Sequence, residues 1–148
     1  MNILILGVGN LLLKDEGIGI HVIQALEKED LPSGVRLMDG GTGGLHLIGF
    51  LQEYSRIIMI DATLDSYPPG TVRLIRPHYA SDFPLLMSAH EIGLRDMIEA
   101  MALSGISPEI QLIVVSVADI SEVGMDLSPE VAAAIPEVIK KVKEILAY

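Results

Sequence analysis

The chain alternates short apolar runs with segments of helical period, and this alternation constrains the fold more than any other feature of the sequence. The runs rich in Val, Ile and Leu predict strands at Asn2–Leu6, Val35–Asp39, Arg56–Asp61, Thr71–Arg76 and Glu109–Val117. The segments between and after them predict helices at Gly17–Glu29, Leu45–Glu53, Glu91–Ser104 and about Pro129–Leu146. Strands that alternate with helices indicate an α/β fold, a three-layer sandwich with helices on both faces of a mostly parallel sheet.

Two details refine this prediction. The segment "ATLDSYPPG" (Ala62–Gly70) is too short for a helical crossover, so the strand that follows it is predicted to run antiparallel at an edge of the sheet. Near the carboxyl end, Ser128 followed by Pro129 is typical of a helix start, and Pro136 predicts a break between two helices. A length of 148 residues predicts a single domain over residues 1–148.

The composition excludes several classes of function. Asp and Glu outnumber Lys and Arg by 20 to 10, and the net charge of −10 disfavours binding to nucleic acid or to an anionic membrane. The chain has no cysteine, so disulfides, zinc ribbons and a cysteine nucleophile are excluded. No apolar run approaches the roughly 20 residues of a membrane span, and the first residues lack the features of a signal peptide. We therefore expect a cytoplasmic protein.

The stretch "GVGNLLLKDEGIG" (Gly7–Gly19) follows the first predicted strand and suggests a dinucleotide-binding turn. The comparison fails at two positions. Leu12 stands where the fingerprint needs its third glycine, and Asp39 follows Gly9 by 30 residues, where about 20 are expected. A small nucleotide-binding module remains only a minor alternative.

Three acidic or imidazole side chains stand at the predicted carboxyl ends of parallel strands. They are Glu16 after the first strand, Asp61 at the end of the third, and His90 before the third helix. Parallel topology brings these ends to one edge of the sheet, where two carboxylates and one imidazole could bind nickel or zinc. Two structural explanations stay open: Asp61 could close a turn with Thr63, and the acids of the first loop could stabilise the start of a helix.

Other hydrolytic patterns are absent. "HEIGL" (His90–Leu94) lacks the second histidine of a zincin helix, and no G-x-S-x-G elbow occurs. The remaining histidines, His21, His46 and His78, have no evident partners in the pattern and are interpreted as structural.

Taken in order, several motifs resemble the hydrogenase maturation endopeptidases, which process [NiFe] hydrogenases. They are "ILGVGNLLLKDEGIGIHV" (Ile5–Val22), "DGGTGG" (Asp39–Gly44), "IDATLDSYPPGTV" (Ile60–Val72), "SAHEIGL" (Ser88–Leu94), "GISPEIQLIVVSV" (Gly105–Val117) and "LSPEV" (Leu127–Val131). The resemblance covers nearly the whole chain and implies the strand order 2-1-3-5-4. It also implies that Glu16, Asp61 and His90 are the metal ligands and catalytic residues, while the roles of Asp39 and Glu91 are not assigned.

The resemblance further implies a substrate and a metal. The family removes a short C-terminal extension from the precursor of the hydrogenase large subunit after nickel insertion. Nickel would then be supplied by the precursor, although another divalent metal can occupy the site of the isolated protein. A nickel-sensing protein without enzymatic activity, on the same fold, is the alternative to a protease. The sequence predicts no oligomeric state.

Overall fold

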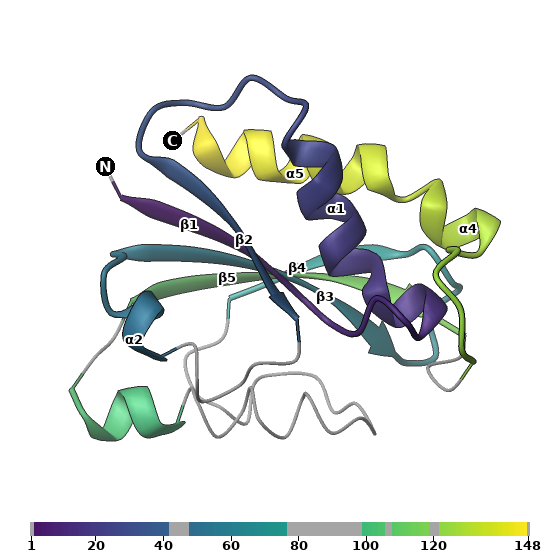
Figure 1. Cartoon of the computed structure of the whole chain (residues 1–148), viewed down its shortest axis with the longest axis horizontal. Coiled ribbons are helices and arrows are strands. Elements are labelled where there is room, and N and C mark those ends of the chain that lie inside the picture. Colours follow the sequence, from purple (N-terminus) through teal and green to yellow (C-terminus); the bar gives the residue numbers. More distant parts are fainter. Residues whose placement is uncertain (1, 42–47, 77–98, 106–107, 119–121, 148) are drawn as a thin grey trace.

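The computed structural model of the chain describes residues 2–41, 48–76, 99–105, 108–118 and 122–147. Its strands are β1 (Ile3–Val8), β2 (Val35–Gly41), β3 (Arg56–Leu64), β4 (Val72–Ile75) and β5 (Glu109–Val117). They form one sheet in the order β2-β1-β3-β5-β4 (Figure 1). The pairs β1–β2, β1–β3 and β3–β5 are parallel, whereas β4 pairs antiparallel with β5 at the edge. The predicted fold class, strand order and antiparallel edge strand are thus confirmed.

Helices lie on both faces of the sheet. One face carries α1 (Ile18–Leu26), α4 (Pro129–Ala132) and α5 (Ile135–Leu146), and the 3-10 helix η1 (Lys14–Gly17) leads into α1 (Figure 1). The other face carries α2 (Ile48–Leu51) and the helical residues 99–103. Among the described residues, no helix has both the length and the apolar character needed to cross a membrane.

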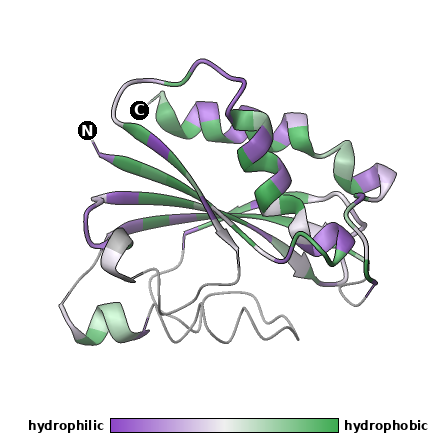
Figure 2. Cartoon of the chain, in the orientation of Figure 1, coloured by the Kyte–Doolittle hydropathy of each residue, from purple (hydrophilic) through white to green (hydrophobic). Residues whose placement is uncertain are grey.

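The core has two parts because successive side chains of a strand point to opposite faces. Ile3 and Ile5 of β1 join the cluster beneath α1 and α5, whereas Leu4 and Leu6 join the cluster on the α2 face. The central strands are therefore mostly apolar on both faces, with polar residues toward their ends, while α5 is apolar on one side only (Figure 2). Truncating one such buried Leu or Ile to alanine typically costs ~2–5 kcal/mol.

Several predicted helix bounds were wrong in detail. The helix predicted at Gly17–Glu29 is α1, preceded by η1, so that Glu16 lies in a helical turn and not in an open loop. Only the part of the predicted helix 91–104 at residues 99–103 falls within the described residues, and the helix predicted at 45–53 is described at Ile48–Leu51. The prediction of a second helix at the carboxyl end is confirmed.

The break between the last two helices falls at Ala133–Ala134, just before the predicted Pro136. Pro136 occupies the first turn of α5, where the missing N–H costs nothing because that amide has no partner within the helix. Ser128 does hold the N-cap position of α4, but its side chain makes no capping hydrogen bond. Its hydroxyl is used elsewhere, at the edge of the sheet that carries the predicted site.

Candidate active site

Two of the three predicted site residues lie together at the carboxyl edge of the parallel strands. Glu16 belongs to η1, directly after β1, and Asp61 lies near the end of β3. Both carboxylates are buried, since Glu16 is 1% exposed and Asp61 is 2% exposed. A buried carboxylate is costly unless hydrogen bonds or a positive charge compensate it, so two of them at one edge are a strong sign of a functional site.

Gly9 explains how the two acids are brought together. A Cβ atom at this position would lie 2.1 Å from the Glu16 carbonyl oxygen and 3.8 Å from Asp61 Oδ1. Gly9 also has φ of +131°, which side chains rarely allow. The backbone of Glu16 and the carboxylate of Asp61 therefore lie against the same glycine, and no larger residue would permit this approach.

The start of α1 is fixed on β3 in the same way. A Cβ atom at Gly19 would lie 2.3 Å from the Ile60 carbonyl oxygen and 2.5 Å from that of Val8. The helix backbone thus rests directly on the two strands that flank the site. The glycines of the motif allow close packing of backbone on backbone, which is a different role from holding a phosphate.

Asp61 is oriented by the strand that carries it. Its Oδ1 atom accepts a hydrogen bond of 2.8 Å from the backbone N–H of Ala62. Thr63 is buried within β3, so the expected alternative of a turn between Asp61 and Thr63 does not occur. Asp61 is held in an extended strand with its carboxylate aimed at the edge of the site.

The neighbouring acid, Asp15, has a structural role. Its Oδ1 accepts from the backbone N–H of Ser128 and its Oδ2 accepts from the Ser128 hydroxyl, each at 2.7 Å. Asp15 therefore ties η1 to the start of α4, and this explains why Ser128 does not cap its own helix. Sequence analysis missed this pairing because it joins residues 113 positions apart.

Backbone hydrogen bonds to Gly124, which is close in sequence to Ser128, also hold η1 in place. Lys14 N–H donates to the Gly124 carbonyl at 2.8 Å, Gly124 N–H donates to the Leu12 carbonyl at 2.7 Å, and Leu13 pairs with Gly124 in a parallel bridge. Lys14 has φ of +45°, which is uncommon for a residue other than glycine. Non-glycine residues in this region persist where surrounding contacts impose them, and they cluster at functional sites.

The side chain of Lys14 adds an ion pair to this link. Its Nζ atom lies 2.8 Å from Glu122 Oε1. The hydrogen bond and the charge of Glu122 raise the pKa of Lys14, with smaller contributions from Asp126 and Asp15. Because the ammonium group is exposed to water, the pair contributes little to stability and mainly fixes geometry.

The remaining predicted residues are placed as follows. His90 and Glu91, together with His46 and His78, lie outside the described residues, and within the described part of the chain no three acidic or imidazole groups could hold one ion. Asp39 is exposed, and its Oδ1 accepts from Gly41 N–H at 2.9 Å within β2, where the register with β1 shifts. His21 Nε2 lies 3.1 Å from the Met125 carbonyl oxygen, a contact in keeping with a structural role.

Comparisons with known proteins agree on one family. A family model described as hydrogenase maturation protease matches residues 20–145. The hydrogenase expression/formation protein HoxM of Azotobacter vinelandii is 38% identical over 150 aligned residues, which cover 99% of this chain and 72% of HoxM. The hydrogenase 2 maturation protease of Escherichia coli K12 is 35% identical, with 96% of this chain and 88% of the relative covered.

Solved structures give the same result. The hydrogenase maturating endopeptidase HybD from Escherichia coli aligns with a TM-score of 0.91 at 35% identity, over 99% of this chain and 93% of HybD. The [NiFe] hydrogenase maturation protease HybD from Thermococcus kodakarensis aligns with a TM-score of 0.80 at 28% identity, over 99% of each chain. The comparisons of sequence and of fold therefore lead to one conclusion: the chain belongs to the hydrogenase maturation protease family and is a peptide-bond hydrolase.

Proposed function

We propose that this chain removes the C-terminal extension from the precursor of a [NiFe] hydrogenase large subunit, and that it recognises nickel already present in that precursor. Membership of the family supports the protease activity and the kind of substrate. The observation that carries the proposal is the pair of buried acids, Glu16 and Asp61, held against Gly9 at the carboxyl edge of the sheet. In this proposal His90 completes the site.

The chemistry of these side chains fits a divalent ion. Carboxylate oxygen and imidazole nitrogen are both suitable donors for nickel or zinc. A positive ion also offsets the cost of placing two carboxylates at 1% and 2% exposure in one part of the protein. Three protein ligands leave coordination positions open for water and for groups of the precursor.

The protein contributes fixed positions for these donors. The Ala62 N–H holds the carboxylate of Asp61, and the links from η1 to Gly124 and Ser128 hold the turn that carries Glu16. A bound ion would supply a Lewis acid that polarises the scissile carbonyl, lowers the pKa of a water molecule, or positions the peptide. Each of these roles depends on donors that do not move when the substrate arrives.

Recognition of nickel would make cleavage depend on prior metal insertion. If precursor groups complete the coordination shell, nickel tightens the binding of the protease to the precursor, and the protease tightens the binding of nickel by the same factor. The isolated protein then retains a divalent metal weakly. Premature processing is avoided because the nickel-free precursor lacks the ion that joins the two proteins.

The test compares nickel-free and nickel-loaded precursor in chelator-treated buffer, with the product masses read by mass spectrometry. We expect cleavage of the loaded precursor only. Glu16→Gln and Asp61→Asn remove charge with little change in volume, which is preferable to alanine because both residues are buried. These variants and His90→Ala should abolish cleavage, whereas Glu144→Gln, an exposed change on α5, should leave it intact.

The outcomes separate the parts of the proposal. Cleavage of both precursors at equal rates would refute nickel recognition and leave the protease activity standing. Absence of cleavage of either precursor would refute the proposed activity for this chain. Full activity in Glu16→Gln or Asp61→Asn would show that the predicted site is wrong.

A further inference from the structure

Most of the exposed large apolar side chains among the described residues lie on segments at the edge of the sheet that carries the candidate site. Five large hydrophobic side chains are exposed among the described residues, namely Leu12 (59%), Tyr67 (49%), Val123 (77%), Met125 (56%) and Leu103 (90%). The first four lie on segments at the carboxyl edge, whereas Leu103 is the last of the helical residues 99–103 on the α2 face. Single exposed apolar residues need no explanation, but a group of them marks an interaction site.

These four side chains belong to segments that meet around one cavity. The cavity has a volume of about 410 Å³. Lys14 lines it from the segment of Leu12, Pro69 from the turn of Tyr67, and Glu122 from the segment of Val123 and Met125. We call the four side chains and this cavity the rim surface.

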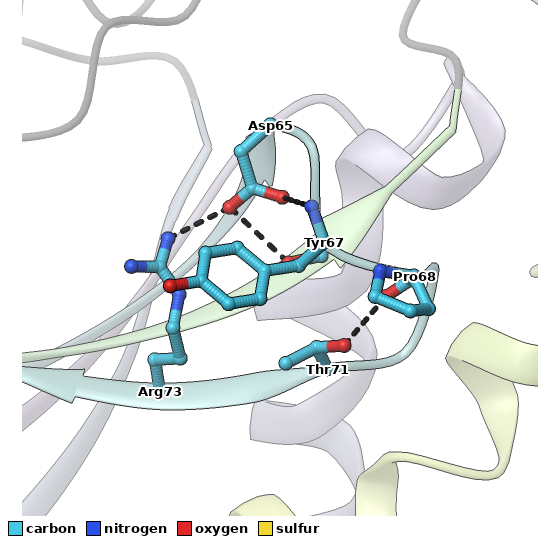
Figure 3. A network of polar contacts seen from close by, with 6 residues as sticks. Asp65, Tyr67, Pro68, Thr71 and Arg73 are labelled. Carbon is cyan, nitrogen blue, oxygen red and sulfur yellow. Dashed lines mark hydrogen bonds and ion pairs between the residues drawn. The ribbon is translucent and has the colours of Figure 1, made fainter.

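Several contacts hold the turn that carries Tyr67. Arg73 stacks on the ring of Tyr67, with its guanidinium carbon 4.4 Å from the ring centre (Figure 3). Asp65 accepts from Arg73 Nη2 at 2.7 Å and from Tyr67 N–H at 3.0 Å, so the turn is fixed at both ends of the stack (Figure 3). A partner that binds here loses little affinity to ordering of the protein.

The other two segments are equally fixed. The backbone hydrogen bonds between Leu12, Lys14 and Gly124 join the segment of Leu12 to that of Val123 and Met125. Tyr67, which Asp65 and Arg73 hold in place, is an aromatic side chain of the kind that often dominates binding energy at protein interfaces. The rim surface therefore has the features of a protein-docking site.

The charges of the cavity indicate the chemistry of the partner. Asp15 is engaged by Ser128 and Glu122 by Lys14, but Asp126 and Glu130 have no ion-pair partner among the described residues. Both of these carboxylates are exposed. A partner that meets the rim surface is therefore favoured if it carries Lys or Arg beside its apolar side chains.

We propose that the rim surface docks a segment of the large-subunit precursor in which apolar side chains are flanked by Lys or Arg, away from the scissile bond. The inference rests on the function proposed above. Asp15 lines the cavity and the next residue is Glu16, so the short helix η1 contributes both to the rim surface and to the candidate site. A precursor whose scissile segment reaches Glu16 then lies across this surface, which acts as an affinity site separate from the chemistry.

The first test removes the apolar contacts. The triple variant Leu12→Ser, Val123→Ser and Met125→Ser is compared with Leu103→Ser, the most exposed apolar side chain outside the rim surface. We expect the KM for nickel-loaded precursor to rise about tenfold or more in the triple variant, with kcat within about twofold of wild type. Leu103→Ser should leave both constants unchanged.

The second test reverses the charges. Asp126→Lys with Glu130→Lys is compared with Glu137→Lys and Glu144→Lys, two exposed acids of α5 that change the net charge equally. The first pair should weaken precursor binding several-fold at low salt and much less at about 0.5 M salt, whereas the second pair should have a much smaller effect. Equal effects of the two pairs would show a response to net charge alone and overturn the assigned surface.

The remaining outcomes are distinct. If wild type cleaves the loaded precursor and the triple variant has the wild-type KM, the docking proposal fails while the proposed function stands. If wild type does not cleave, the proposed function fails first. If wild type sediments as a dimer and the triple variant as a monomer, the rim surface binds a second copy of the chain and the proposal is overturned. Urea unfolding of each variant confirms that exposed substitutions have left the fold intact.

Discussion

Replacing Gly9 by alanine tests whether close packing at this glycine builds the site. The new Cβ would lie 2.1 Å from the Glu16 carbonyl oxygen, where ordinary contacts begin at 3.4 Å, so η1 must move by more than an ångström. The obstacle is backbone and cannot rotate away. The shift therefore acts directly on the distance between Glu16 and Asp61.

Two effects lower the free energy of unfolding of Gly9→Ala. Placing a side chain at φ of +131° costs ~1–3 kcal/mol of backbone strain. Overpacking costs a further ~1–3 kcal/mol. Their total, about 2–6 kcal/mol, is a large share of the ~5–15 kcal/mol that stabilises a typical domain. For a chain of this size the melting temperature should fall by roughly 5–20 °C.

The assays are thermal unfolding and processing of nickel-loaded precursor. Because misplacement of a reacting group by ~1 Å can cost about a hundredfold in rate, we expect processing by folded Gly9→Ala to fall by about that factor. Gly49→Ala is the matched control, since Gly49 lies in α2 and a Cβ there meets no atom of the described residues within 4 Å. Alanine is the better helix former, so this control should be as stable as wild type or slightly more stable. The reasoning would be refuted if Gly9→Ala melted within about 2 °C of wild type and processed the precursor at the wild-type rate.

Two further predictions concern the contacts that hold η1. Asp15→Ala removes the two oxygen atoms that accept hydrogen bonds from Ser128. Urea titration should show a free energy of unfolding lower by about 2–4 kcal/mol. A loss below about 1 kcal/mol would contradict the structural role assigned to Asp15. Glu122→Gln should return the pKa of Lys14 toward its ordinary value of 10.5, as followed by NMR titration of the lysine side chain, and an unchanged titration would contradict the pairing. Because pairing raises the pKa of Lys14 in the folded state, its small stabilising effect is present below pH 10.5 and is lost as the pH rises through the raised folded value.

Much of the fold was predictable from local pattern. The apolar runs located each strand that the described residues form. The shortness of Ala62–Gly70 was enough to predict an antiparallel β4, because a parallel crossover needs a longer connection. The strand order could not be predicted from local pattern, since periodicity does not determine which strands are neighbours. That order came from resemblance to the family, and the sheet confirms it.

The site was predictable only in part. Parallel topology brought Glu16 and Asp61 to one edge, but spacing alone could not show that Asp15, the neighbour of Glu16, is engaged in a structural contact. Ser128 makes this contact through two hydrogen bonds across the chain. Ser128 was predicted as a helix cap because that is its commonest use in such a motif, and the local pattern contains no sign of its distant partner.

The contacts that hold η1 also have a consequence for biosynthesis. A ribosome releases the amino-terminal part of a chain first, so Glu16 emerges long before Gly124 and Ser128, the residues that fix its turn. Lys14 cannot be held at φ of +45° until those later residues have been made. A nascent chain that already carries Glu16 and Asp61 therefore lacks the contacts that fix the turn of Glu16, and these contacts can form only after Gly124 and Ser128 have been translated.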